Sequence, residues 1–136
     1  MYETFEHTAD LGLRVRAADL PSLFADAGRG LFSIIVAGGV QVQPQEEWRC
    51  ELSGSRLDEL LFDWLNELLY VFESRHLLLA EFHVVLAGEQ LTAQCRGEPW
   101  DPARHQLEHE VKAITYHGLR VEQTADGWLA EVIVDI

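Results

Sequence analysis

The last two residues, Asp135 and Ile136, place a side-chain carboxylate beside main-chain and terminal carboxylate oxygens. These are hard oxygen ligands, which suit Ca²⁺, Mg²⁺ or Mn²⁺ and do not suit a thiophilic metal. A further carboxylate, Asp10, stands at the entrance to the first long strand that the sequence predicts. If folding brings the two ends of the chain together, these groups form an acidic metal pocket. If it does not, Asp135 is a solvated terminal residue and Asp10 a turn former, and the residues alone leave both interpretations open.

Lys112 is the only lysine in the chain, beside nine arginines. It lies in the segment 111–117, whose alternation of side chains predicts a strand. Its stem can cover apolar surface while the ammonium group balances carboxylates or reaches a phosphate on a partner's nucleotide. The preference for arginine also fits genomic base composition, in which case the single lysine has no functional meaning.

Two other stretches carry polar side chains, Glu6-His7-Thr8-Ala9-Asp10 and Gly97-Glu98. We interpret His7 as a hydrogen-bonded structural histidine and Thr8 as a strand residue or a local cap. The sequence contains no phosphate loop, no G-x-S-x-G, no H-E-x-x-H and no Cys-His nucleophile pattern. A self-sufficient hydrolase would be unusual without one of these.

The bulk composition predicts one globular domain covering residues 1–136. The 23 acidic and 10 basic residues give a formal net charge of -13. Such a field repels phosphate, and the chain has no basic run, so we expect neither direct tight nucleic-acid binding nor attraction to an acidic membrane surface. Basic proteins and cations are better partners for this charge.

Several features favour a cytoplasmic protein. Cys50 and Cys95 have no metal-site or redox spacing, so we interpret both as small buried hydrophobes. The first residues lack the basic and apolar regions of a signal peptide, and no apolar run approaches the ~18 residues of a membrane span.

The elements that must position the candidate residues begin with a strand over 11–17, where apolar residues alternate with others. Asp19 is expected to cap a helix whose apolar residues recur from Leu20 to Ile35, with Gly38-Gly39 ending the pattern. Gly28 and Gly30 weaken this prediction, since each costs up to ~1 kcal/mol relative to Ala in a helix interior.

A short strand over 48–52 precedes a second helix, for which Ser55 and Asp58 resemble a capping box. The apolar face of this helix runs from Leu57 to Phe72 and predicts a core face. The rest of the chain predicts strands. Two of them, at 82–86 and 91–95, form a hairpin. After a polar loop, three more follow at 111–117, 119–123 and 128–134. This order predicts an α+β fold in which a mainly antiparallel sheet packs against two amphipathic helices.

The chain also resembles a known family. FEHTADLGLRVR, LLFDWLNELLYVF, GE, EVKAITYHGLRV and the terminal VDI occur in the order and spacing of archease, and the resemblance covers essentially the whole chain. One departure is Glu6, where the family pattern has Asp directly before His-Thr-Ala-Asp. Because this keeps the charge but moves the carboxylate by a methylene, Glu6 is left out of the expected ligand set.

The resemblance implies an accessory role, with no catalytic residue in this chain. Archease-like proteins assist an RtcB-type RNA ligase in RNA repair and tRNA splicing, by promoting its metal-dependent guanylylation with GTP and its repeated turnover. It also implies that Asp10, Asp135 and Ile136 hold a divalent metal ion, with Lys112 contacting phosphate or the ligase.

Two other functions stay open at this point. The first is a holdase-like chaperone or general interaction module, which would bind many clients through exposed apolar surface. The second is an autonomous metal-dependent phosphohydrolase that uses the acidic pocket.

Overall fold

The computed structural model describes residues 1–7, 10–38 and 41–136. Three predictions made above fall outside this part of the chain, those for the side chain of His7, for Thr8 and for Gly39. The elements in chain order are β1 (Tyr2–His7), β2 (Asp10–Ala17), α1 (Leu20–Ile35), β3 (Glu46–Ser53), α2 (Leu57–Arg75), β4 (Leu77–Ala87), β5 (Gln90–Pro99), β6 (Ala113–Ile114), β7 (Arg120–Thr124) and β8 (Gly127–Asp135).

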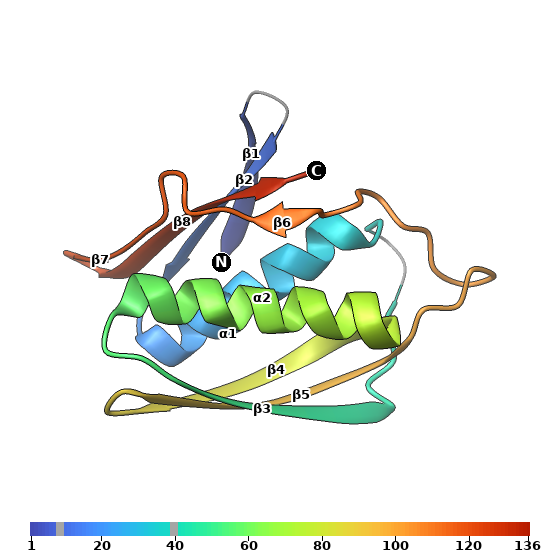
Figure 1. Cartoon of the computed structure of the whole chain (residues 1–136), viewed down its shortest axis with the longest axis horizontal. Helices are drawn as coiled ribbons and strands as arrows, with labels where there is room; N and C mark the ends of the chain where they lie inside the picture. The colour runs from blue at the N-terminus through green and yellow to red at the C-terminus, as the bar shows by residue number, and fades with distance from the viewer. Residues whose placement is uncertain (8–9, 39–40) are drawn as a thin grey trace.

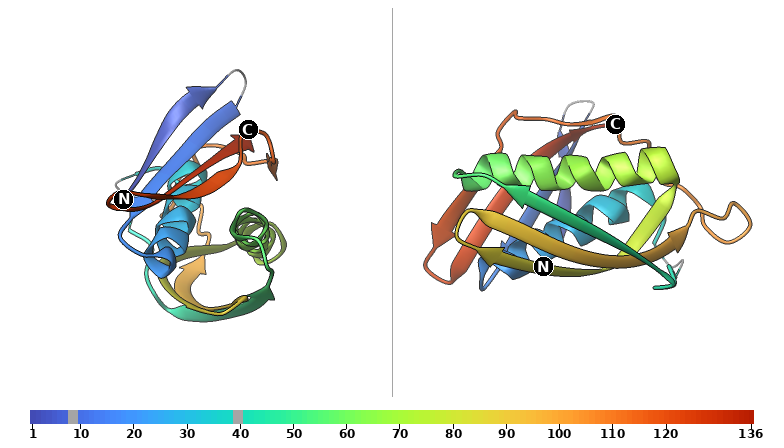
Figure 2. Two further views of the ribbon diagram at one scale, coloured as in Figure 1. Left: turned by 90° about the vertical axis from the view of Figure 1, so that its left-hand side faces the viewer. Right: turned by 60° about the horizontal axis from the view of Figure 1, so that its bottom comes forward.

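The two helices lie between two antiparallel sheets, which gives three layers (Figures 1 and 2). A five-stranded sheet has the order β1-β2-β8-β6, with β7 also paired to β8, and a three-stranded sheet has the order β3-β5-β4. The inward faces of both sheets and the helices form one hydrophobic core. This confirms the predicted α+β class and its two amphipathic helices, with the strands divided between two sheets.

Both sheets pack against helix α1, and they contact it more closely than they contact α2. Asp19 caps it as predicted, because its carboxylate accepts a hydrogen bond from the Ser22 N–H at 2.8 Å. A Cβ at Gly28 would lie 2.8 Å from the Phe82 ring of β4, whereas one at Gly30 would lie 2.5 Å from Leu13 of β2. The two glycines that weaken the helix on propensity therefore let it approach one sheet each.

Helix α2 buries the apolar face that its sequence predicts. Trp64 is fully buried and donates a hydrogen bond from Nε1 to the Phe24 carbonyl oxygen at 2.8 Å, which joins α2 to α1. The expected capping box is wrong, because the N-cap residue is Arg56 and it makes no side-chain cap hydrogen bond. No helix in the described ranges is both long enough and apolar enough to cross a membrane.

The late strands differ in length from their predictions. The hairpin after β4 turns at Gly88, whose φ of 60° suits glycine. The predicted strand over 111–117 is mostly wrong, since β6 contains only Ala113–Ile114.

Strand β1 was not predicted. It is an edge strand with mostly exposed side chains, so its sequence carries no clear apolar alternation.

Candidate functional site

The fold brings together the candidate residues from opposite ends of the chain. Asp10 opens β2 and Asp135 closes β8, and the two are direct partners in the antiparallel pairing of these strands. On the other side of β8, Asp135 is paired with Ala113 of β6. The main-chain N–H of Lys112 donates a hydrogen bond to the Asp135 carbonyl oxygen at 2.7 Å. We call Asp10, Lys112, Asp135 and Ile136 the acidic tip.

The two carboxylates of the acidic tip share one face of the sheet. Side chains directly opposite each other in an antiparallel pair point the same way, and successive residues alternate. The next pair, Leu11 and Val134, packs into the core, and Val134 has no exposed surface. Asp10 and Asp135 therefore point to the outer face, away from the helices.

The residues of the acidic tip differ in how far their side chains are buried. Asp10 and Asp135 are half-buried, and Ile136 packs its side chain against the core. Lys112 is exposed, and it forms no ion pair with any other residue in the described ranges. The tip therefore offers oxygen atoms held by paired strands, and Lys112, which joins it through its main chain, carries an ammonium group that solvent can reach.

The segment that leads to Lys112 is fixed to the end of α1. The Ala37 N–H bonds to the Gln106 carbonyl at 2.8 Å, and the Glu108 N–H bonds to the Ile35 carbonyl at 2.8 Å. These backbone bonds use the carboxyl end of α1, where helix carbonyls lack intrahelical partners. They hold the segment in place without a long strand, which is why β6 is so short.

Glu98 is a second anchor of this segment. It is buried, and Arg104 donates to both of its oxygens, from Nη2 to Oε2 at 3.2 Å and from Nη1 to Oε1. The Gln43 N–H also donates to it, and His105 Nε2 lies 3.4 Å away, which is long for a hydrogen bond. The hydrogen bond from Arg104 is the main reason that the pKa of Glu98 falls to about 2.

This anchor gives Gly97-Glu98 a structural explanation. A Cβ at Gly97 would lie 1.7 Å from the Leu78 carbonyl oxygen, so the backbones of β5 and β4 meet there too closely for any side chain. The sequence identified the pair as polar and unusual but not as a buried ion pair. A signal was available in Arg104, which follows Glu98 by six residues in an otherwise exposed loop.

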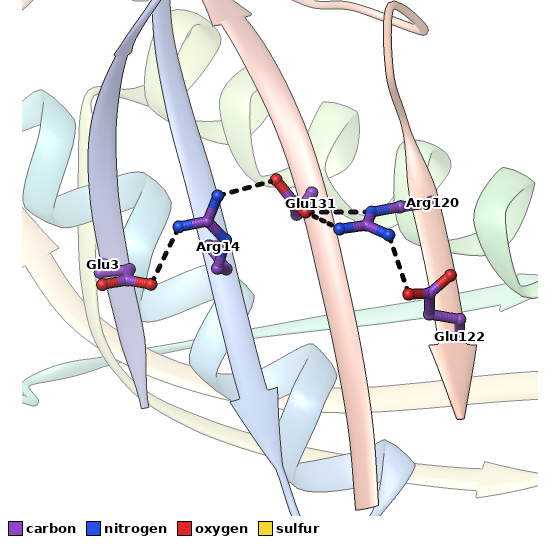
Figure 3. Close-up of polar contacts among 5 residues, drawn as sticks. All are labelled: Glu3, Arg14, Arg120, Glu122 and Glu131. Carbon is purple, nitrogen blue, oxygen red and sulfur yellow. Dashed lines mark hydrogen bonds and ion pairs between the residues drawn. The ribbon is translucent and has the colours of Figure 1, made fainter. Parts of the chain in front are cut away.

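The same outer face carries a set of paired charges four residues further along β8. Figure 3 shows Glu131 between two arginines, with Arg14 at 3.2 Å and Arg120 Nε at 3.0 Å. Arg14 also reaches Glu3, and Arg120 reaches Glu122 at 2.8 Å. Hydrogen bonding from Arg120 is the largest cause of the lowered pKa of Glu131. We call these five residues the charge ladder.

Residues 2–136 match the Archease protein family. The chain belongs to the archease family. It is 40% identical to protein archease of Methanopyrus kandleri over 99% of both chains, and 38% identical to that of Methanosarcina acetivorans over 99% of this chain and 95% of the relative.

Two solved structures have the same archease fold. The solution structure of Methanobacterium thermoautotrophicum protein 1598 has a TM-score of 0.88 at 30% identity, covering 99% of this chain and 98% of that one. A Thermotoga maritima protein described as an archease, possible chaperone, has a TM-score of 0.68 at 22% identity, covering 100% and 98%. The second likeness supports the fold alone.

The donor atoms of the acidic tip are of the kind that hard cations take as ligands. The tip offers two carboxylates on neighbouring strands and main-chain and terminal oxygens at Ile136, a donor set that fits a hard divalent ion. No group of three His, Cys, Asp or Glu side chains among the described residues has metal-binding geometry. Among the described residues, a metal at the tip would have two carboxylates and the main-chain oxygens of Ile136 as its ligands.

Proposed function

We propose that this protein is an accessory factor that activates an RtcB-type RNA ligase. In this role it promotes metal-dependent guanylylation of the ligase with GTP and supports repeated turnover in RNA repair and tRNA splicing. The observation that carries the proposal is the direct pairing of Asp10 with Asp135, with Lys112 bonded to the Asp135 carbonyl. These are the positions that the family resemblance singles out, and they meet at one end of the sheet.

The proposal assigns Asp10, Asp135 and the main-chain or terminal oxygens of Ile136 to a divalent ion. Such an ion supplies concentrated positive charge next to a phosphate. The chain's own residues fix where that charge is presented, because β2 and β8 hold the two carboxylates in register. Lys112 is exposed and its main-chain N–H is bonded to the Asp135 carbonyl oxygen, and its ammonium group would contact a phosphate or a ligase carboxylate.

Charge on the whole molecule favours the same partner. A net charge of -13 opposes competition for RNA, because the sequence has no basic run with which counterion release could drive phosphate binding. The same charge attracts a basic RNA-binding enzyme and speeds the encounter with it.

The test is single-turnover guanylylation of a cognate ligase with GTP, with and without this protein, across a titration of divalent ions. We expect the wild-type protein to increase the rate, and Asp10→Asn to remove most of that increase. Asp63→Asn is the matched control, because Asp63 is exposed on α2 and the substitution makes the same chemical change. Equal stimulation by wild type and Asp10→Asn would contradict the assignment of the tip.

A holdase-like chaperone is the second candidate, since the T. maritima relative is described as a possible chaperone. A holdase needs a contiguous exposed apolar patch. The large exposed apolar side chains of the described residues come from five segments of the sequence, as Met1 and Tyr2, Tyr70, Val85, Leu107, and Tyr116. Suppression of aggregation of unrelated unfolding proteins, unchanged by Asp10→Asn, would favour the chaperone over the ligase activator.

A further inference from the structure

A groove of about 510 Å³ lies between the last turns of α2 and the segment 107–112. This volume falls within the range of about 300–1,000 Å³ that is typical of ligand sites. Its apolar lining comes from the ends of both helices and from the segment itself, as Ile35, Leu69, Phe72, Leu107 and Val111. Leu107 is 38% exposed, so part of its apolar side chain is accessible to a ligand in the groove.

The rim of this groove is strongly acidic. Glu73, Glu108 and Glu110 line it, and Lys112 is the only Lys or Arg that does so. None of the three carboxylates forms an ion pair with another residue in the described ranges. The carboxyl end of α2 also lies here, with His76 as its C-cap, and a helix C-terminus adds partial negative charge. The apolar lining is therefore bordered by a concentration of negative charge.

We infer that this groove, which we call the α2 groove, docks a basic amphipathic segment of the partner protein. An apolar side chain of that segment would fill the groove, and flanking Arg or Lys side chains would meet the three glutamates. The inference rests on the proposed function, because it supplies the docking surface for the same partner.

The charges on the α2 groove exclude its other plausible occupants. A nucleotide or RNA phosphate would face three carboxylates against one lysine. A second copy of this chain would bring its own net charge of -13. A basic protein segment is the occupant for which both the apolar lining and the rim are complementary.

Position links the α2 groove to the acidic tip. Lys112 lines the groove, and its main-chain N–H is bonded to Asp135. A partner held in the groove would therefore lie directly beside the tip. The groove would account for affinity, while the tip would account for stimulation.

The test compares two double charge reversals for binding to the cognate ligase. Glu73→Lys with Glu110→Lys changes the rim, whereas Glu51→Lys with Glu89→Lys changes β3 and the β4–β5 hairpin, outside the groove. All four glutamates are exposed, and both pairs change the net charge equally. We expect the rim pair to raise the Kd for the ligase at least tenfold and the control pair to raise it less than threefold, because long-range steering is screened by salt.

A third variant tests the apolar part of the groove. Leu107→Ser removes an exposed side chain and should raise the Kd about threefold to tenfold while leaving thermal unfolding unchanged. Equal weakening by the two charge-reversal pairs, or no weakening by the rim pair, would overturn the docking assignment and leave the proposed function standing. If the wild-type protein neither binds nor stimulates the ligase, the proposed function itself fails, and the docking assignment fails with it.

Discussion

The outer face of the five-stranded sheet carries charged groups at two places along β2 and β8. The two places differ in the charges that the strands bring together. At Arg14 and Glu131 every charge of the ladder has an opposite charge within hydrogen-bonding distance (Figure 3). About 13 Å further along the strands, at Asp10 and Asp135, two carboxylates stand side by side. The ladder alternates opposite charges across neighbouring strands, whereas the tip pairs two carboxylates across neighbouring strands, the type of oxygen ligand that hard cations take.

The largest effect on ligase stimulation is expected from a substitution at Asp135. Asp135→Asn keeps the shape of the side chain, and the Asp135 carboxylate has no hydrogen-bond or ion-pair partner within the described ranges. We expect stimulation of ligase guanylylation to fall roughly 10- to 100-fold, in line with the loss of groups that support a metal site. The free energy of unfolding should change by less than about 0.5 kcal/mol. Divalent-ion titration calorimetry and thermal unfolding of the same preparation measure the two effects.

Glu98 gives the next largest effect, on stability. Glu98→Gln removes a buried carboxylate that Arg104 and the Gln43 N–H contact, so we expect a loss of about 2 kcal/mol in the free energy of unfolding at neutral pH. Denaturant unfolding measures this loss. Stimulation at a temperature where the variant is folded should fall only if the segment 100–112 moves Lys112.

The lowered pKa of Glu98 also predicts a pH dependence. The carboxyl has an ordinary pKa of 4.5 and a folded-state pKa of about 2. Its contribution to stability is therefore complete above about pH 4.5 and is lost as the pH falls through about 2. Between these values the wild-type protein should lose stability more steeply than Glu98→Gln, and parallel curves would show that the ion pair contributes nothing.

A substitution at Glu131 should have a smaller effect, and it tests whether the tip alone acts on the ligase. Glu131→Gln is the same chemical change as Asp135→Asn, made on the same strand four residues away. Because Glu131 joins Arg14 and Arg120 near the surface, we expect a loss of about 1 kcal/mol in stability. Ligase stimulation should stay at the wild-type level. A loss of stimulation equal to that of Asp135→Asn would mean that the whole face, and not the tip, acts on the ligase.

Local patterns in the sequence were enough to predict most elements of this fold. Asp19 before a periodic apolar run predicted the start of α1, and the apolar face of α2 predicted its burial. Gly88 between two alternating segments predicted the hairpin of β4 and β5. In each case the residues that form the element also lie next to one another in the sequence.

Two of the failures involve partners that are distant in sequence. The segment after Glu110 alternates like a strand, but Val111 and Ile114 are both buried at a spacing of three, because backbone bonds to the end of α1 set its path. Glu98 is buried because Gln43 reaches it across 55 residues. The sequence therefore predicted the types of these residues and not their environments.

For the candidate site too, the sequence predicted the types of the residues and not their arrangement. Hard-ligand chemistry identified Asp10 and Asp135 from their types, but the residues alone did not decide between a metal pocket and two isolated carboxylates. What decides that they meet is the register of β2 on β8, which follows from the match of two inward-facing apolar rows. The family resemblance supplied this long-range information before the structure did.

Lys112→Arg gives the smallest expected effect and tests whether positive charge alone is sufficient at this position. Lys112→Arg keeps the positive charge, and the main-chain N–H that bonds to Asp135 is unaffected. Because the side chain is exposed, the larger guanidinium has room, and we expect stimulation to fall only twofold to threefold. Lys112→Gln, measured beside it, should reduce stimulation at least tenfold. If both substitutions reduce stimulation equally, charge is not sufficient, and the compact ammonium group must enter a site on the ligase that a guanidinium cannot.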